Sequence, residues 1–285
     1  MTAFDPRTTP ARPDLAAKHL QGQVAAVRFV DGVLREVVEA QAPLRRASEL
    51  DAPFATEALR GERVTVYEED GEGWCWGQLA ADGYVGFVPQ QALMPPGPEP
   101  THRVAALRTF VFPGPSIKVP PLMALSLGSR IAIVRFDRGF GWLAAGGCIP
   151  EQHLATVDAV EPDFVAVAER FVGVPYLWGG KTSLGLDCSG LVQVALNAAG
   201  FACPRDSDMQ EQALGTPLGP SEIDVLQRGD LIFWKGHVAI VRNADVLVHA
   251  NAFHMAVAVE PIAEALRRIA AAGGAPTSVR RLPTA

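Results

Sequence analysis

The chain has 285 residues, 48% of them hydrophobic, and its 25 basic and 31 acidic residues give a formal net charge of −6. A chain of this length can form two or three domains and bury a sizeable core. The mildly acidic charge and the dispersed Lys and Arg residues argue against nucleic acid or an anionic membrane as a partner. No dinucleotide-binding or phosphate-loop fingerprint occurs, and we expect no cofactor.

Residues 1–40 are predicted to be an N-terminal segment, in which 23–29 and 36–38 resemble a pair of strands. The first ten residues lack the basic start and the apolar run of a signal peptide. No stretch reaches the roughly 18 consecutive apolar residues of a transmembrane helix. The four cysteines lack the spacing of a disulfide framework, which suits free thiols in a reducing compartment. We therefore expect a cytoplasmic protein that has no membrane partner.

Two segments on either side of a Pro-rich break at 94–100 echo each other. The run Gly61-Glu-Arg-Val-Thr-Val66 recurs as Gly128-Ser-Arg-Ile-Ala-Ile133, and Gly73-Trp74 recurs as Gly141-Trp142. Each segment consists of short alternating stretches with Gly and Pro turns, a pattern typical of a small β-barrel. The repeat predicts a first barrel over 41–98 and a second, more diverged barrel over 101–158.

The remaining residues, 160–285, carry the candidate chemistry. A glycine-rich loop leads into Cys188, after which apolar residues recur at helical spacing until Gly200, a helix-stop signal. Cys188 is therefore predicted at the positive end of a helix. Such a position favours the thiolate and can lower a cysteine pKa from about 8.5 to between about 3.5 and 7.5. The alternative is a buried structural cysteine.

Two apolar runs around a polar turn at 242–245 predict a β-hairpin. If the turn is centred on Asn243, His237 lies directly opposite His249, with Cβ atoms about 4.5 to 5.5 Å apart. A thiol needs a base to accept its proton, and the base needs a third group to orient its ring. Cys188, His237 and His249 suit these roles in that order, although either histidine alone could be structural.

The chain resembles the NlpC/P60 family of papain-like cysteine peptidases, which cleave peptidoglycan stem peptides. The resemblance covers roughly 160–285 and rests on three blocks: Tyr176-Leu-Trp-Gly-Gly180 with Asp187-Cys-Ser-Gly190, Gly229-Asp230 leading to Gly236-His237, and His249-Ala-Asn251. It implies an α+β papain-like peptidase domain after two small SH3-like β-barrels, since the segments 41–98 and 101–158 resemble bacterial SH3-like domains. It also implies catalysis by the cysteine and two histidines above, with Tyr176 near the developing oxyanion.

This arrangement resembles a subgroup, the γ-D-glutamyl-L-diamino acid endopeptidases, which trim free murein peptides. In that subgroup the first barrel caps the cleft and selects substrates with a free N-terminal L-alanine. The resemblance implies that Tyr84 and Asp206 contact the substrate ammonium, because a buried ammonium needs a carboxylate partner. The other substrate-binding candidates are Trp178 and, for the D-glutamate carboxylate, Ser189 and Ser207.

Alternatives remain at these positions. Asp208 could replace Asp206, while Glu57 or Asp51 could be a second acidic contact for the ammonium. Tyr84 could be an ordinary aromatic residue of the barrel, and Asp206 a surface loop residue.

The expected function is hydrolysis of the γ-D-glutamyl bond to the diamino acid in small murein peptides. This reaction would serve the recycling of cell-wall peptides. The sequence leaves the choice between diaminopimelate and lysine open, as well as the oligomeric state. A thiol acyltransferase or amidase of the same fold, or a non-catalytic protein that binds peptidoglycan peptides, is the alternative. Zinc ligation by Cys188, His237, His249 and His254 is not expected, because these residues lack the close pairs of zinc sites.

Overall fold

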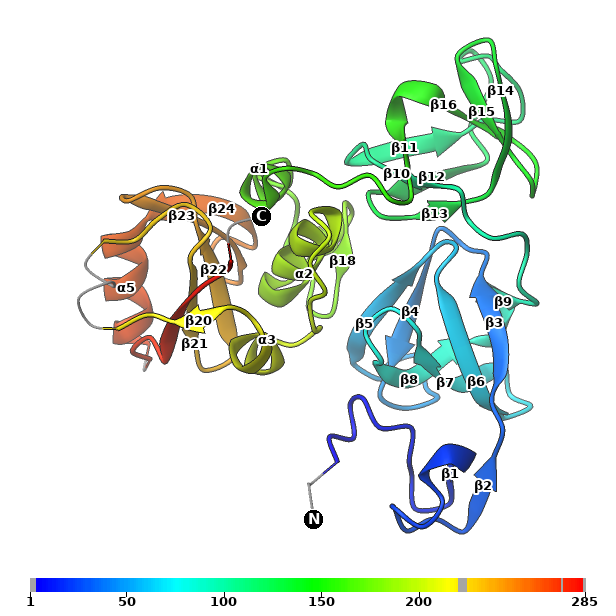
Figure 1. The fold of residues 1–285 in the computed structure, drawn as a ribbon, viewed down its shortest axis with the longest axis horizontal. Helices are drawn as coiled ribbons and strands as arrows, with labels where there is room; N and C mark the ends of the chain where they lie inside the picture. Colours follow the sequence, from blue (N-terminus) through cyan, green and yellow to red (C-terminus); the bar gives the residue numbers. More distant parts are fainter. Residues whose placement is uncertain (1–3, 220–224, 273, 284–285) are drawn as a thin grey trace. The chain divides into compact units, whose positions relative to one another are not determined.

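The computed structural model describes residues 4–219, 225–272 and 274–283 (Figure 1). The chain forms two compact units, Met1–Ala159 and Val160–Ala285. Within the described ranges, every α-helix belongs to the second unit, and the first is built from strands and short 3₁₀ turns. None of the helices in these ranges is long and apolar enough to cross a membrane.

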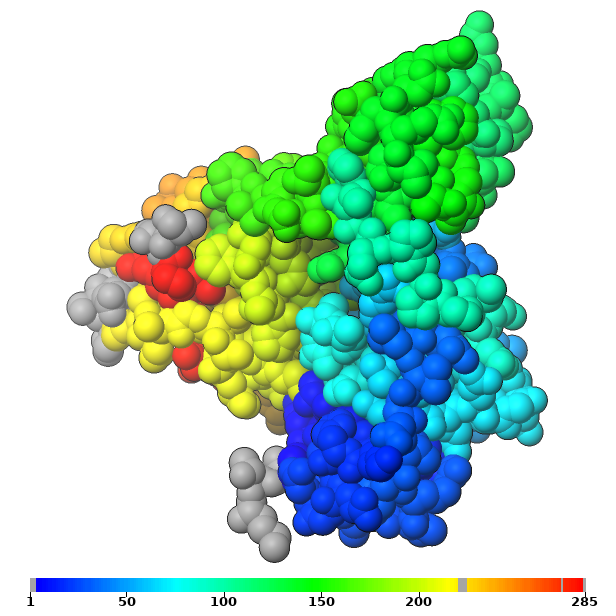
Figure 2. Space-filling model, turned by 45° about the vertical axis from the view of Figure 1, so that its right-hand side comes forward, coloured from blue at the N-terminus to red at the C-terminus, as the bar shows by residue number. Residues whose placement is uncertain are grey.

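The N-terminal segment differs from its prediction. Strand β1 (Leu15–Ala17), which is followed by the 3₁₀ turn η1 (Lys18–Leu20), is fully buried and pairs in parallel with β2 (Arg28–Val30). The next strand, β3 (Val33–Val37), pairs with a strand of the following sheet instead of with β2. Ahead of β1, Arg12 lies over the ring of Trp76 in that sheet. Figure 2 shows the segment, in dark blue, packed against the cyan surface of the sheet.

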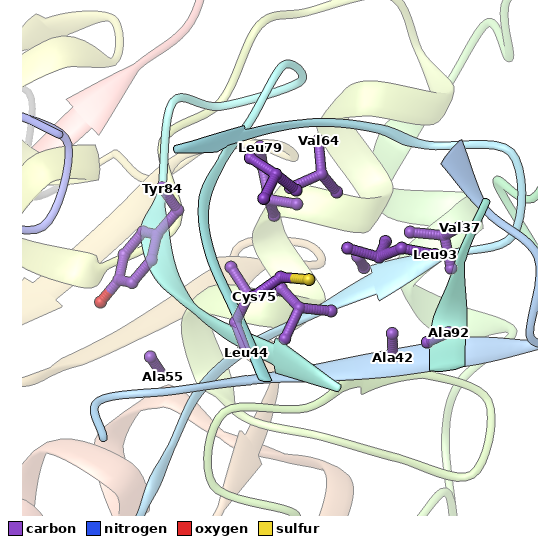
Figure 3. Packing of buried hydrophobic residues seen from close by; sticks show 13 residues of the cluster. Val37, Ala42, Leu44, Ala55, Val64, Cys75, Leu79, Tyr84, Ala92 and Leu93 are labelled. Carbon is purple, nitrogen blue, oxygen red and sulfur yellow. The ribbon is translucent and has the colours of Figure 1, made fainter. Parts of the chain in front are cut away.

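The first sheet has seven antiparallel strands and a core of its own. Val64 and Val66 are buried while Thr65 between them is partly exposed, the alternation expected of a strand with one face in a core. Leu44, Leu79 and other apolar side chains converge in this core (Figure 3). In sheet order the strands are β5 (Phe54–Leu59), β4 (Gln41–Arg45), β8 (Val85–Pro89), β7 (Trp74–Leu79), β6 (Arg63–Glu69), β3 and β9 (Leu93–Met94), with the 3₁₀ turn η2 (Gln90–Ala92) before β9.

The segment predicted as a second barrel forms three small antiparallel sheets around a separate core. That core contains Val104, Leu125, Ile131 and Ile149. The sheets are β13 (Arg130–Ile131), β10 (His102–Val104) and β17 (Leu154–Thr156); β11 (Arg108–Val111) and β12 (Met123–Ser126); and β14 (Ile133–Asp137), β15 (Phe140–Leu143) and β16 (Cys148–Pro150), with the 3₁₀ turn η3 (Glu151–His153) before β17.

The second unit is built on a six-stranded antiparallel sheet. Helix α2 (Cys188–Ala198) packs against two neighbouring interior strands of this sheet and against α1 (Phe164–Glu169). Ile262 and Ala265 of α5 (Ile262–Ala271) pack on other side chains of the sheet, which lies between α5 and α2 in Figure 1. In sheet order the strands are β20 (Thr216–Pro217), β25 (Ser278–Arg281), β21 (Leu231–Trp234), β22 (His237–Val241), β23 (Val246–Asn251) and β24 (Ala256–Pro261); a small hairpin of β18 (Lys181–Thr182) and β19 (Gly185–Leu186) precedes α2, and α3 (Ser207–Ala213) follows it. Helices packed on an antiparallel sheet agree with the predicted α+β class.

Candidate active site

Cys188 is the first residue of α2, as the sequence pattern predicts. The preceding residue, Asp187, caps the helix by accepting a hydrogen bond from the backbone N–H of Gly190 at 2.7 Å. A Cβ at Gly190 would lie 2.3 Å from the carbonyl oxygen of Gly180, so only glycine lets the loop approach the first helical turn this closely. The glycine-rich loop and the cap together fix where the cysteine stands.

A buried ion pair reinforces this helix start. Arg205 is 1% exposed, and its guanidinium binds both oxygens of Asp187, at 2.9 and 2.8 Å. The same guanidinium donates to the Ser189 hydroxyl at 2.9 Å, and that hydroxyl donates to Asp187 at 3.3 Å. Sequence reasoning did not single out Arg205 or a structural role for Asp187.

The environment of the Cys188 thiol opposes ionisation. Burial, followed by the negative charge of Asp187, raises the pKa of Cys188 to about 12. Hydrogen bonds from the backbone N–H groups of Val238 and Ser189 and the charge of Arg205 act in the opposite direction. The sequence led us to expect a lowered pKa at the helix start; burial and Asp187 outweigh that effect here.

The two histidines meet, although not in the predicted register. Ile240 pairs with Val248 and Val241 with Leu247, so His249 continues the register opposite Ala239 rather than opposite His237. Because side chains on one face recur every second residue, a diagonal pair still shares a face. The rings are 5.1 Å apart between centroids, with His237 Nε2 2.9 Å from His249 Nδ1.

The Asn243 side chain accounts for the altered register. Its Oδ1 accepts hydrogen bonds from the backbone N–H groups of Asp245 and Val246, at 3.0 and 3.1 Å. This turn around the Asn side chain lengthens the loop and moves its centre one residue beyond Asn243. The direct cross-strand pairing of the histidines was therefore wrong, whereas their placement on one face of the sheet was correct.

Beyond the histidines lies a carboxylate that the sequence analysis missed. Glu260 in β24 is 7% exposed, and its Oε2 lies 3.3 Å from Nε2 of His249. Both carboxylate oxygens accept from the Arg268 guanidinium at 2.9 Å. Burial is the largest cause that lowers the pKa of His237 and of His249, each to about 3. A continuous series of side-chain contacts therefore links His237, His249, Glu260 and Arg268 in that order.

Tyr176 and Trp178 lie directly before Gly179 and Gly180 of the glycine-rich loop. Burial, then the charges of Cys188 and Asp187, raise the pKa of the Tyr176 hydroxyl, which places this ring in the electrostatic neighbourhood of the thiol. Because of this raised pKa, the tyrosine hydroxyl stays a neutral donor near neutral pH, as a contact to an oxyanion requires. Trp178 is 64% exposed.

The remaining predicted substrate contacts are placed less uniformly. Asp206 precedes α3 and Ser207 begins it, both partly exposed, directly after the buried Arg205. Ser189 is 5% exposed, with its hydroxyl between Arg205 and Asp187. Tyr84 belongs to the first unit, where it is 2% exposed and packs in the core of the first sheet (Figure 3).

The alternative acidic residues have different surroundings. Glu57 is 2% exposed and accepts a hydrogen bond from the Gln41 amide at 3.0 Å. Asp51 and Asp208 are exposed.

His249, His254 and Glu260 bring potential metal-ligand atoms within 4.8 Å of one another. Only the histidines belong to the set that the sequence suggested. The guanidinium of Arg268 already binds both oxygens of Glu260 and supplies a positive charge there. A metal cation at the same carboxylate would be repelled by this charge, so the donor set does not favour a metal.

Comparisons with known proteins assign two segments of the chain to known domains. Residues 173–268 match the NlpC/P60 family, and residues 44–93 match the bacterial dipeptidyl-peptidase SH3 domain. The chain is 27% identical over 238 residues to dipeptidyl-peptidase 6 of Lysinibacillus sphaericus, covering 75% of this chain and 86% of that protein. It is 27% identical over 229 residues to the γ-D-glutamyl-L-lysine dipeptidyl-peptidase of Bacillus subtilis, covering 70% of this chain and 73% of that protein.

The fold is shared with a solved structure. A crystal structure of an NlpC/P60 family protein from Bacillus cereus has a TM-score of 0.73 and 21% identity to this chain, covering 88% of this chain and all of that one. The match at residues 44–93 confirms the predicted SH3-like domain ahead of the peptidase fold. The chain therefore combines an NlpC/P60 domain at residues 173–268 with a bacterial dipeptidyl-peptidase SH3 domain at residues 44–93, as its similarity to dipeptidyl-peptidases also indicates.

Proposed function

We propose that the protein is a cysteine endopeptidase that hydrolyses the γ-D-glutamyl bond to the diamino acid in free murein peptides. The observation that carries the proposal is that Cys188, at the start of α2, accepts a hydrogen bond from the backbone N–H of Val238, the neighbour of His237, which a 2.9 Å hydrogen bond joins to His249. The similarity to dipeptidyl-peptidases supports the peptide class.

The chemistry follows from the three side chains. His237 accepts the proton of Cys188, and the sulfur attacks the γ-carbonyl carbon of D-glutamate. The resulting oxyanion accepts hydrogen bonds from the Cys188 backbone N–H and the Tyr176 hydroxyl. The C–N bond then breaks, His237 protonates the leaving amine, and a thioester remains. Water hydrolyses the thioester after giving a proton to His237, which returns it to the thiolate.

Substrate selection is assigned by the resemblance. Asp206 and Tyr84 would bind the free ammonium of the N-terminal L-alanine, with Ser207 and Ser189 at the D-glutamate carboxylate and Trp178 at the cleft. Arg205 occupies the Ser189 hydroxyl, which makes Ser207 the better placed of the two serines. A peptide with a free amine is the product of earlier wall cleavage, so the proposed role is the recycling of wall peptides in the cytoplasm.

The domain boundaries complete the proposal. We place the first SH3-like barrel at 41–98, a second, diverged SH3-like unit at 101–158 and the peptidase domain at 160–285, after the N-terminal segment 1–40. The separate core of residues 101–158 supports the assignment of this segment as a distinct SH3-like domain.

The test is hydrolysis of L-Ala-γ-D-Glu-meso-diaminopimelate, its L-lysine analogue and the N-acetylated peptide, followed by mass spectrometry. We expect cleavage of a free-amine peptide between glutamate and the diamino acid, and slower cleavage of the N-acetylated form. Cys188→Ala should abolish cleavage. Cys203→Ala, which removes another buried thiol, is the matched control and should retain it.

Other outcomes separate the alternatives. Equal cleavage of free and acetylated peptides would reject the ammonium contacts while leaving the peptidase. A product that carries an added amine would indicate acyl transfer, and binding without any turnover would indicate a binding protein.

A further inference from the structure

Glu260 is positioned to act on the catalytic pair through His249. The His249 side chain is fully buried, and its two ring nitrogens face different partners, His237 at Nδ1 and Glu260 at Nε2. Arg268 reaches from α5 to hold the carboxylate, while its guanidinium lies 4.5 Å from the centre of the Phe253 ring. Both ends of the Glu260–Arg268 pair are therefore fixed by further contacts.

The direction of the hydrogen bonds follows from the carboxylate. An ionised carboxylate only accepts, so the proton of a neutral His249 ring must sit on Nε2. Its Nδ1 is then an acceptor, and the 2.9 Å contact must be donated by Nε2–H of His237. A neutral His237 with its proton on Nε2 has an unprotonated Nδ1. That nitrogen is the one left to accept the proton of Cys188.

Without the carboxylate, the opposite arrangement becomes available. His249 could carry its proton on Nδ1 and donate to Nε2 of His237, which would place the His237 proton on Nδ1. The ring would then present an N–H group to the thiol and could not act as its base. In a Ser-His-Asp triad, a histidine held in the wrong tautomer loses most of the activity. This loss shows how large the effect is when the whole population has the wrong tautomer.

Besides burial, which has the largest effect, the charged groups around the histidines shift the pKa values of their rings, some upward and some downward. The charges of His249 and Arg268 lower the pKa of His237, whereas those of Glu260 and Asp187 raise it. The charges of Arg268 and His254 lower the pKa of His249. Glu260 thus favours the imidazolium that His237 becomes during the reaction, and Arg268 limits this while it orients the carboxylate.

We infer that Glu260, held by Arg268, is a positioning residue that sets the tautomers of His249 and His237 so that His237 can accept the Cys188 proton. This inference rests on the proposed catalytic roles of the cysteine and the histidines. A purely structural reading, in which the pair only braces α5 against β24, makes different predictions.

The first test needs no variant and no peptide. In protein labelled with ¹⁵N at histidine, the ring-nitrogen shifts at neutral pH report which nitrogen carries the proton. We expect both His237 and His249 to carry it on Nε2, with assignments from His237→Gln and His249→Gln. A proton on Nδ1 of His249 would overturn the inference.

The second test measures the reactivity of the thiol. Glu260→Gln is compared with a matched control, Glu264→Gln. Glu264 lies on α5 and lines the same pocket as Glu260, so the control removes a negative charge from that pocket. Alkylation of Cys188 by iodoacetamide is followed between pH 5 and pH 9 by peptide mapping, beside kcat and KM for the cleaved peptide. We expect Glu260→Gln to lower the alkylation rate and kcat about tenfold to a hundredfold with KM little changed, an effect of the size that outer hydrogen-bond partners commonly have.

The outcomes separate this inference from the proposed function. If the folded Glu260→Gln protein has the same alkylation rate and the same kcat as the parent protein, the Glu260–Arg268 pair is only a structural brace. If no peptide is cleaved but the tautomers and the alkylation behave as expected, the substrate proposal fails and the positioning role stands. If the variant does not fold, the tautomers of the parent protein decide.

Discussion

At the scale of single residues, the proposed catalytic pair, Cys188 and His237, is neutral on both sides. Burial raises the pKa of Cys188 to about 12 and lowers that of His237 to about 3. A neutral thiol and a neutral imidazole keep charge out of a desolvated site until a substrate carbonyl can accept it. In the proposed mechanism, the proton transfer would then be coupled to attack on the substrate rather than completed beforehand.

These pKa directions predict the acid side of the pH profile. A histidine base works only when neutral, and a lowered pKa keeps it neutral to lower pH than the usual value near 6.5 allows. We expect kcat/KM for the cleaved peptide to stay constant from pH 7 to pH 5 and to fall only as the pH approaches the lowered pKa of His237. Circular dichroism at each pH separates loss of activity from unfolding. An acid limb near pH 6.5 would show that the ring is solvated like a free histidine.

Glu260 shows what the residue pattern conceals. It ends an apolar run in Ala256–Pro261, where a charged side chain on a buried strand needs a partner. That signal was present, but its partner His249 depends on the pairing of β23 with β24, and Arg268 depends on how α5 packs. Neither arrangement can be obtained from one strand's pattern.

At the scale of elements, the first turn of α2 could be predicted and the hairpin offset could not. Helical spacing and the stop at Gly200 define a helix by local rules. A strand offset instead depends on the turn, where the Asn243 side chain adds hydrogen bonds that alternation does not reveal. The two histidines still share a face because the pairing is shifted by two residues, which is one full period of side-chain alternation.

The Asp187–Arg205 pair leads to a prediction about this first turn. Replacing Arg205 by Met leaves a buried carboxylate without its main partner, a change that typically costs about 3–5 kcal/mol. We expect Arg205→Met to lower the free energy of unfolding by that amount in urea denaturation. It should also reduce peptide cleavage, because Asp187 caps the helix that begins at Cys188.

Arg228→Met supplies the control. This arginine also binds carboxylates, but its side chain is 40% exposed, so the loss should stay below about 1 kcal/mol. Equal losses in the two variants would mean that burial of the Arg205 pair contributes nothing to the stability of α2.

At the scale of the whole molecule, the two units have separate hydrophobic cores. Leu44 lies in the core of the first sheet, and Leu247 lies in the core between the second sheet and α5. The repeat in the sequence predicted that the N-terminal half would be built from small β units. It did not predict that β3 joins the first sheet, because a strand's partner is a long-range choice that its local pattern does not encode.

Separate cores predict that the two units can be destabilised one at a time. Leu44 and Leu247 are both fully buried, and truncation of a buried leucine to alanine costs about 2–5 kcal/mol. We expect Leu44→Ala to weaken hydrogen-exchange protection over 44–93 and leave 173–268 protected, and Leu247→Ala to do the reverse. Mass spectrometry of the exchanged peptides resolves the two ranges in one sample. Because each variant serves as the control for the other, equal loss of protection in both ranges would mean that the cores unfold as one cooperative unit, despite being built from different residues.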